Sequence, residues 1–77
     1  MSVRDNKIAE SEVRAPPGKI RIVAYEHVQA KLAYYLVDDV NTEQAAREQV
    51  VSWQAKRLPF LAFAAFDEFG DLVCGHG

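Results

Sequence analysis

Two residues near the end of the chain, Cys74 and His76, could form a nucleophilic pair. They are two positions apart, and in a strand this spacing places both side chains on the same face. A thiolate beside an imidazole is a known nucleophilic arrangement, and His27 would add a third ligand for zinc. The sequence has no C-x-x-C or H-x-x-x-H spacing, and a lone cysteine in a strand is usually a small buried hydrophobe. We therefore interpret Cys74 as structural, and expect no metal site and no catalytic residue.

A second group of polar residues lies between positions 38 and 42. Asp38 and Asp39 come at the end of a predicted helix, where carboxylates oppose the helix dipole. The unfavourable interaction with the helix dipole would be explained if these carboxylates held the amine of a small molecule. The alternative interpretation is that they are ordinary solvated surface residues. If a substrate site exists, its candidate residues are Tyr35, Asp39, Asn41 and Thr42.

The elements that would position these residues centre on a β-hairpin predicted from Pro59 to Gly77. Residues 60–66 are uncharged and apolar on both alternating faces, which predicts a strand in the interior of a sheet. Residues 67–71 supply the turn, where Gly70 is free to adopt positive φ, and Leu72 to Cys74 form the return strand.

Two further elements are predicted ahead of the hairpin. Lys19 to Ala24 alternates charged and apolar residues, as a half-exposed strand does. From Glu26 to Val40 the spacing of apolar residues changes to i, i+4, i+7, i+8 and i+12, which predicts a helix of about four turns. The residues of that stripe are Val28, Leu32, Tyr35, Leu36 and Val40.

A second helix is predicted after Asn41-Thr42. Gln44 lies three residues after Asn41, in capping-box spacing, and Pro59 ends the segment. The buried face of this helix would carry Ala46, Val50 and Trp53. The predicted fold class is therefore α+β, in the order β-α-α-β-β, with a three-stranded antiparallel sheet packed with two helices.

Length and composition limit the domain organisation and the setting. The 77 residues suffice for one small domain with a thin core. Residues 1–18 are polar and end in Ala15-Pro16-Pro17-Gly18, which predicts a disordered tail before a folded part at 19–77. A net charge of −2 gives no reason to expect nucleic acid as a partner. No apolar run is long enough for a membrane span, and one cysteine without a secretory signal favours the cytoplasm.

Several short pieces of the sequence share their order and spacing with a known enzyme family. They are Ile20-Arg21, Glu26-His27-Val28, Tyr34-Tyr35, Val40-Asn41-Thr42, Trp53, Pro59-Phe60-Leu61-Ala62 and Gly70-Asp71-Leu72-Val73-Cys74-Gly75-His76-Gly77. Together they resemble the N-terminal half of the GNAT superfamily of acetyl-CoA-dependent N-acetyltransferases, most closely its phosphinothricin acetyltransferase-like branch. The resemblance covers about Lys19 to Gly77.

The resemblance implies a partial N-acetyltransferase domain at 19–77. In the complete family a primary amine of a small molecule attacks the thioester of acetyl-CoA. The loop after Asn41-Thr42 is shorter here than in these relatives, and the family's fourth strand, pyrophosphate loop and general base lie beyond Gly77. A pyrophosphate site needs a glycine-rich turn that opens a helix, and the sequence has none. We therefore expect a truncated product or gene-model fragment that lacks the acetyl-CoA site and is inactive alone.

The alternative hypothesis is a small non-catalytic α+β module. In this interpretation the strand at Leu72 to Cys74 lies at an open edge of the sheet. An open edge invites pairing with a strand of a partner chain. A homodimer through that edge would be one such assembly.

Overall fold

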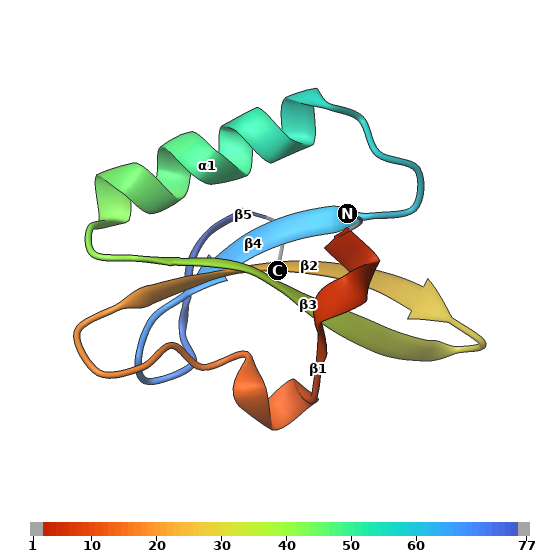
Figure 1. Cartoon of the computed structure of the whole chain (residues 1–77), viewed down its shortest axis with the longest axis horizontal. Coiled ribbons are helices and arrows are strands. Elements are labelled where there is room, and N and C mark those ends of the chain that lie inside the picture. The colour runs from red at the N-terminus through yellow and green to blue at the C-terminus, as the bar shows by residue number, and fades with distance from the viewer. Residues whose placement is uncertain (1–2, 76–77) are drawn as a thin grey trace.

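The computed structural model describes residues 3–75, which form a five-stranded antiparallel sheet with one α-helix packed on it (Figure 1). The spatial order of the strands is β1-β3-β2-β4-β5, and every neighbouring pair is antiparallel. The fold is α+β, but the predicted three-stranded sheet with two helices is wrong. The elements are η1 (Val3–Asn6), β1 (Lys7–Ile8), η2 (Glu10–Glu12), β2 (Ile20–Val28), β3 (Lys31–Val40), α1 (Glu43–Ala55), β4 (Ala62–Phe66) and β5 (Leu72–Gly75).

The helix predicted at residues 26–40 does not exist in this structure. That segment forms the end of β2, a tight turn and all of β3. Val28 pairs with Lys31, so only Gln29 and Ala30 connect the two strands. The predicted first strand is confirmed at its start, and it continues four residues beyond its expected end at Ala24.

The composition of this segment favours strands, and its turn lacks the usual signal. Tyr34, Tyr35 and Val37 are aromatic or β-branched, and such residues are enriched in strands. Two-residue hairpin turns that need positive φ at both positions usually carry Asn-Gly or Asp-Gly. Here Gln29 and Ala30 adopt φ values of 51° and 66°. Neither residue is glycine or asparagine, so the sequence gives no sign of a turn at this point. The apolar residues on either side therefore matched a continuous helical spacing, and the prediction of a helix was wrong.

The helix predicted after Asn41-Thr42 is confirmed as α1. Its N-cap is Thr42 rather than Asn41, because the Thr42 hydroxyl accepts a hydrogen bond from the backbone N–H of Ala45 at 3.1 Å. Ala46 and Val50 are buried as expected. They pack on the sheet in a core with residues of β2, β3 and β4, which include Ile22, Ala24, Ala33, Tyr35, Phe63 and Ala65.

The hairpin predicted near the end of the chain is also confirmed. β4 lies between β2 and β5, so it is an interior strand as expected, although it begins at Ala62 rather than Phe60. Gly70 in the turn has a φ of 83°. Gly75 is required for a different reason, since a Cβ atom there would lie 2.5 Å from the carbonyl oxygen of Phe63.

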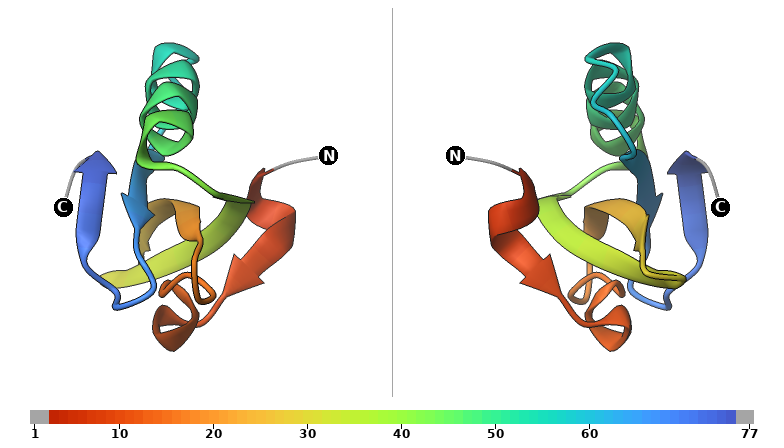
Figure 2. Two further views of the ribbon diagram at one scale, coloured as in Figure 1. Left: turned by 90° about the vertical axis from the view of Figure 1, so that its left-hand side faces the viewer. Right: turned by 90° about the vertical axis from the view of Figure 1, so that its right-hand side faces the viewer.

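The segment expected to be a disordered tail is folded over its described part, residues 3–18. β1 pairs with the outer edge of β3, and residues 10–18 lie across the face of the sheet opposite α1 (Figure 2). Val13 and Ala15 are buried, and the backbone N–H of Ala15 donates to the carbonyl of Asp67 at 3.0 Å. This segment covers the second apolar face of the sheet. Among residues 3–75, no helix has the length and apolar character needed to cross a membrane.

The β2–β3 turn provides a test that separates the hairpin from a helix. We expect Gln29→Asn combined with Ala30→Gly to raise the free energy of unfolding by about 1–2 kcal/mol, because both new residues tolerate the left-handed conformation. Urea unfolding followed by Trp53 fluorescence measures the change. A control, Ala55→Gly on α1, should lower stability by up to about 1 kcal/mol. Loss of stability in the double variant would contradict the hairpin, because both residues disfavour a helix.

Candidate functional site

Tyr35, a predicted substrate residue, is committed to an internal network. Its side chain is 6% exposed, and its hydroxyl donates to Oε2 of Glu26 at 2.6 Å. Arg4 donates from Nε and Nη2 to the two carboxylate oxygens of Glu26, at 3.0 Å each. The hydrogen bonds from Arg4 are the largest cause that lowers the pKa of Glu26, and the hydrogen bond from Tyr35 is the second. The Glu26 carboxylate, followed by burial, raises the pKa of Tyr35. The network fastens the N-terminal segment to the sheet.

Asp39, the second candidate, forms an ion pair with Arg21 on the neighbouring strand. Nε of Arg21 lies 2.8 Å from Oδ1 of Asp39, and Nη2 lies 3.0 Å from Oδ2. Arg21 also donates to the carbonyl of Glu12 at 2.6 Å, so this pair lies on the face covered by the N-terminal segment. Tyr35 lies on the opposite face, in the core beneath α1.

The two remaining candidates also have structural partners. Asn41 accepts a hydrogen bond from the Lys19 ammonium, and Thr42 caps α1. The structure therefore does not bring Tyr35, Asp39, Asn41 and Thr42 together. Each side chain makes an interaction that stabilises the fold, and the four do not line a common cavity of the described residues.

Cys74 is half-buried on β5, and its environment does not favour a thiolate. Burial is the main cause that raises its pKa, and the nearby Arg47 lowers it by less. The proposed partner His76 lies outside the described residues. His27 is exposed near the far end of β2, whereas Cys74 pairs with Ala65, which in turn pairs with Ile22. Five residues of strand separate these positions, about 17 Å. No cluster of metal-ligating side chains occurs within residues 3–75.

The start of α1 does not fit the pyrophosphate of acetyl-CoA, the cofactor that the family resemblance implies. A pyrophosphate needs free backbone N–H groups at a helix N-terminus. Here the Thr42 hydroxyl already binds the N–H of Ala45, and the Glu43 carboxylate adds negative charge to the first turn. Residues 31–42, which lead into α1, contain no glycine. Residues 3–75 therefore offer no place for this cofactor at their one α-helix.

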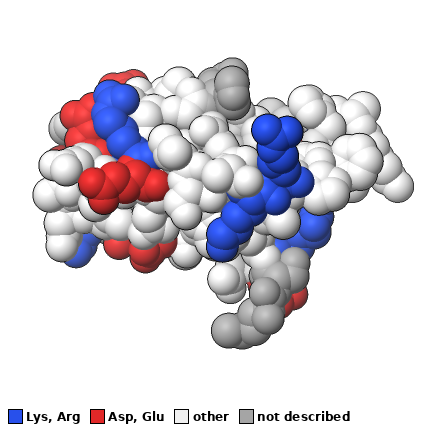
Figure 3. Space-filling view, turned by 90° about the horizontal axis from the view of Figure 1, so that it is seen from above, with Lys and Arg blue, Asp and Glu red and all other residues white. Residues whose placement is uncertain are grey.

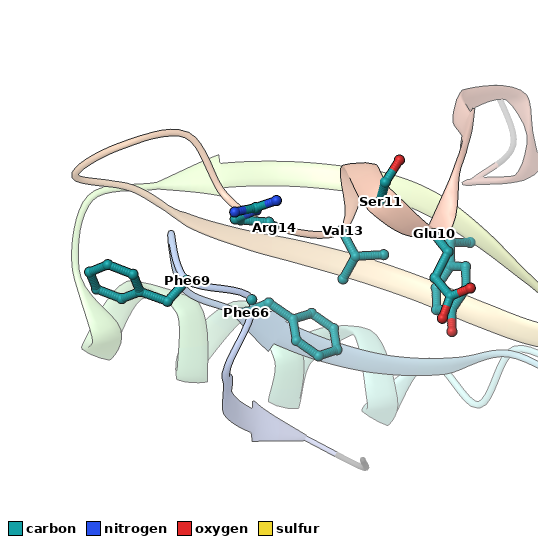
Figure 4. A pocket seen from close by; sticks show the side chains of 8 residues that line it. Glu10, Ser11, Val13, Arg14, Phe66 and Phe69 are labelled. Atoms are coloured by element: carbon teal, nitrogen blue, oxygen red, sulfur yellow. The ribbon is translucent and has the colours of Figure 1, made fainter.

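An open groove on the face away from α1 was missed by the sequence interpretation. It has a volume of about 450 Å³. In Figure 4 Val13 lies above Phe66, with Glu10 to one side and Phe69 at the other end. Burial and the nearby Glu10 carboxylate raise the pKa of Tyr34, which also lines the groove. The groove went unpredicted because residues 10–14 were assigned to a disordered tail.

The clearest exposed feature of the sheet is the outer edge of β5. This strand is last in the spatial order, and β4 is its only neighbour among the described strands. Natural edge strands often carry charged residues or proline, which prevent pairing with another strand. Leu72–Gly75 carries neither. Leu72 is 46% exposed. At the other edge of the sheet, the two residues of β1 pair with Tyr34 and Tyr35 of β3, and β1 itself is too short to pair extensively.

No protein-family model, curated protein or solved structure matches the chain.

The Glu26 network predicts a pH-dependent contribution to stability. The folded-state pKa of Glu26 is lowered, so its contribution is present above the unfolded pKa of about 4.3. It is lost as the pH falls through the folded value. We expect Glu26→Gln to be less stable than the parent chain at pH 7, and the difference to shrink in acid. Unfolding in urea at pH 7 and at lower pH values measures both.

Glu48→Gln, on the exposed side of α1, is the matched control for this measurement. We expect it to leave the stability nearly unchanged at pH 7. A difference between Glu26→Gln and the parent chain that stays constant from neutral to acid pH would show that the Glu26 charge does not contribute.

Proposed function

We propose that the protein is a non-catalytic α+β interaction module that pairs the β5 edge of its sheet with β5 of a second copy. The observation that carries the proposal is the open edge of an uncharged strand, Leu72–Gly75, at the end of a five-stranded sheet. Antiparallel pairing of two such edges would join the sheets of two copies into one continuous sheet.

The strand sequence supports pairing with itself. In an antiparallel arrangement centred on β5, Leu72 lies opposite Gly75 of the second copy, and Val73 lies opposite Cys74. No like charges face one another in this register, because the strand has none. The added contact is small, so we expect weak, concentration-dependent association with a Kd of roughly 10 µM to 1 mM.

A non-catalytic role agrees with the arrangement of the polar residues. Tyr35, Asp39 and Thr42 stabilise the fold, and burial raises the pKa of the Cys74 thiol. The element order that suggested an acetyltransferase includes a helix at 26–40, which is absent. The present proposal does not depend on that resemblance.

Leu72→Glu tests the proposal, because it places a charge at the edge on a side chain that is already half exposed. We expect the average mass of the parent chain in light scattering to rise above the monomer mass as the concentration rises toward about 1 mM. We expect the variant to stay closer to the monomer mass. Amide exchange at residues 72–75 should slow with concentration in the parent chain only.

Val51→Glu is the matched control, since Val51 is an exposed apolar residue on α1 and is not part of β5. This variant should associate like the parent chain. Equal association of Leu72→Glu and the parent chain would rule out the edge as the interface, as would amide exchange at 72–75 that does not depend on concentration.

A further inference from the structure

The two ends of β4 carry opposite charge, and each presents an exposed phenylalanine. The loop before β4 contains Lys56 and Arg57 and no acidic residue, whereas the turn after it contains three acidic residues and no basic one. Phe60 is 88% exposed in the loop, and Phe69 is 76% exposed in the turn. In Figure 3 positive side chains gather right of the centre of this face, and the left end carries both negative and positive side chains.

The acidic turn, residues 67–71, holds Phe69 in a fixed position. Oδ1 of Asp67 accepts hydrogen bonds from the backbone N–H groups of Phe69 and Asp71, at 2.9 Å each. The backbone of Asp67 makes two further bonds across the turn, to Asp71 and Gly70, at 3.0 Å each. The backbone that carries Phe69 is therefore already ordered before any contact forms, and this lowers the entropic cost of a contact.

The loop at the other end of β4 borders an apolar hollow. The hollow has a volume of about 340 Å³, and its lining combines apolar side chains with two cationic ones: Val3, Trp53, Leu58, Pro59 and Leu61, with Arg4 and Lys56. The ammonium of Lys56 lies 4.3 Å from the centroid of the Trp53 ring. We call this feature the basic hollow. It combines room for an aromatic ring with positive charge at the border, which is the complement of the acidic turn.

We infer that the acidic turn of one copy docks into the basic hollow of a second copy, with the Phe69 ring against Leu58 and the edge of Trp53. The two faces of the Trp53 ring are covered by Phe63 and by the Lys56 ammonium. Glu68 and Asp71 would then lie near Lys56 and Arg57. The contact cannot form within one molecule, because the five residues of β4 separate the two features by about 17 Å. Since the two surfaces differ, the contact is head-to-tail and distinct from the edge-to-edge pairing of β5.

A complementation experiment tests this contact, with every variant made in the Leu72→Glu background so that edge pairing is suppressed. One variant, Phe69→Ala, removes the ring and keeps the basic hollow. The other combines Lys56→Glu with Arg57→Glu, which reverses the charge of the loop and keeps the acidic turn. All three positions are exposed, and circular dichroism checks that the fold is retained.

We expect each variant alone to be monomeric in sedimentation, and an equimolar mixture to form a one-to-one dimer. The mixture restores association because it pairs one intact hollow with one intact turn. Trp53 is the only tryptophan, so its emission should change on mixing, and the change should weaken at 1 M salt, where screening is nearly complete beyond about 3 Å. Val51→Ala, on the exposed side of α1, should leave association of the background chain unaltered.

Failure of the mixture to associate would overturn the contact, and so would undiminished association of Phe69→Ala alone. A Leu72→Glu background that is monomeric at every concentration would also overturn it, while leaving the β5 pairing intact. Conversely, association of the Leu72→Glu background that Phe69→Ala abolishes would support the head-to-tail contact. The β5 pairing is tested separately, by the difference in association between Leu72→Glu and the parent chain.

Discussion

The rest of the structure depends on one constraint, which is that the central strands of the sheet are apolar on both faces. Ile22, Val23 and Ala24 follow one another on β2 and are fully buried, although adjacent residues of a strand point to opposite faces. The described chain has a single α-helix, and α1 can cover only one face. Residues 10–18 cover the other face, where Val13 and Ala15 are buried. Arg21, which pairs with Asp39, donates to the carbonyl of Glu12 and fastens this segment to the sheet. The Arg4–Glu26–Tyr35 network fastens the residues ahead of β1 to the face that α1 covers.

That constraint explains which elements the sequence could predict. β4 was recognisable because residues 60–66 are apolar on both faces, and α1 because a cap precedes a regular apolar stripe. The N-terminal segment was missed because it has few apolar residues, and disorder is the usual interpretation of such a composition. Its folded state depends on the contacts that Val13, Ala15 and Arg4 make with residues distant in sequence, which local patterns do not report.

The candidate site was less predictable than the fold. Tyr35, Asp39, Asn41 and Thr42 were grouped because they are close in sequence around a predicted helix end. Residues four apart in a regular strand share a face, but a β-bulge between the partners of Tyr35 and Asp39 shifts the register of β3. The two side chains therefore lie on opposite faces of the sheet. Polar residues in a small domain with a thin core are also needed for caps and cross-strand pairs. The residue types alone could not separate these uses from a substrate site.

The exposed phenylalanines are difficult to explain by the stability of a single copy. Full burial of a phenylalanine contributes roughly 1.5–3 kcal/mol, a substantial share of the 5–15 kcal/mol that is typical of a whole domain. Phe60 and Phe69 nevertheless remain exposed, and Phe60 adopts a φ of 66°, which costs about 1–2 kcal/mol for a residue with a side chain. Phe69, moreover, lies in a turn that four hydrogen bonds hold in place. The contact between copies would recover the burial that the isolated fold forgoes at Phe69, and the opposite charges at the two ends of β4 give that contact its direction.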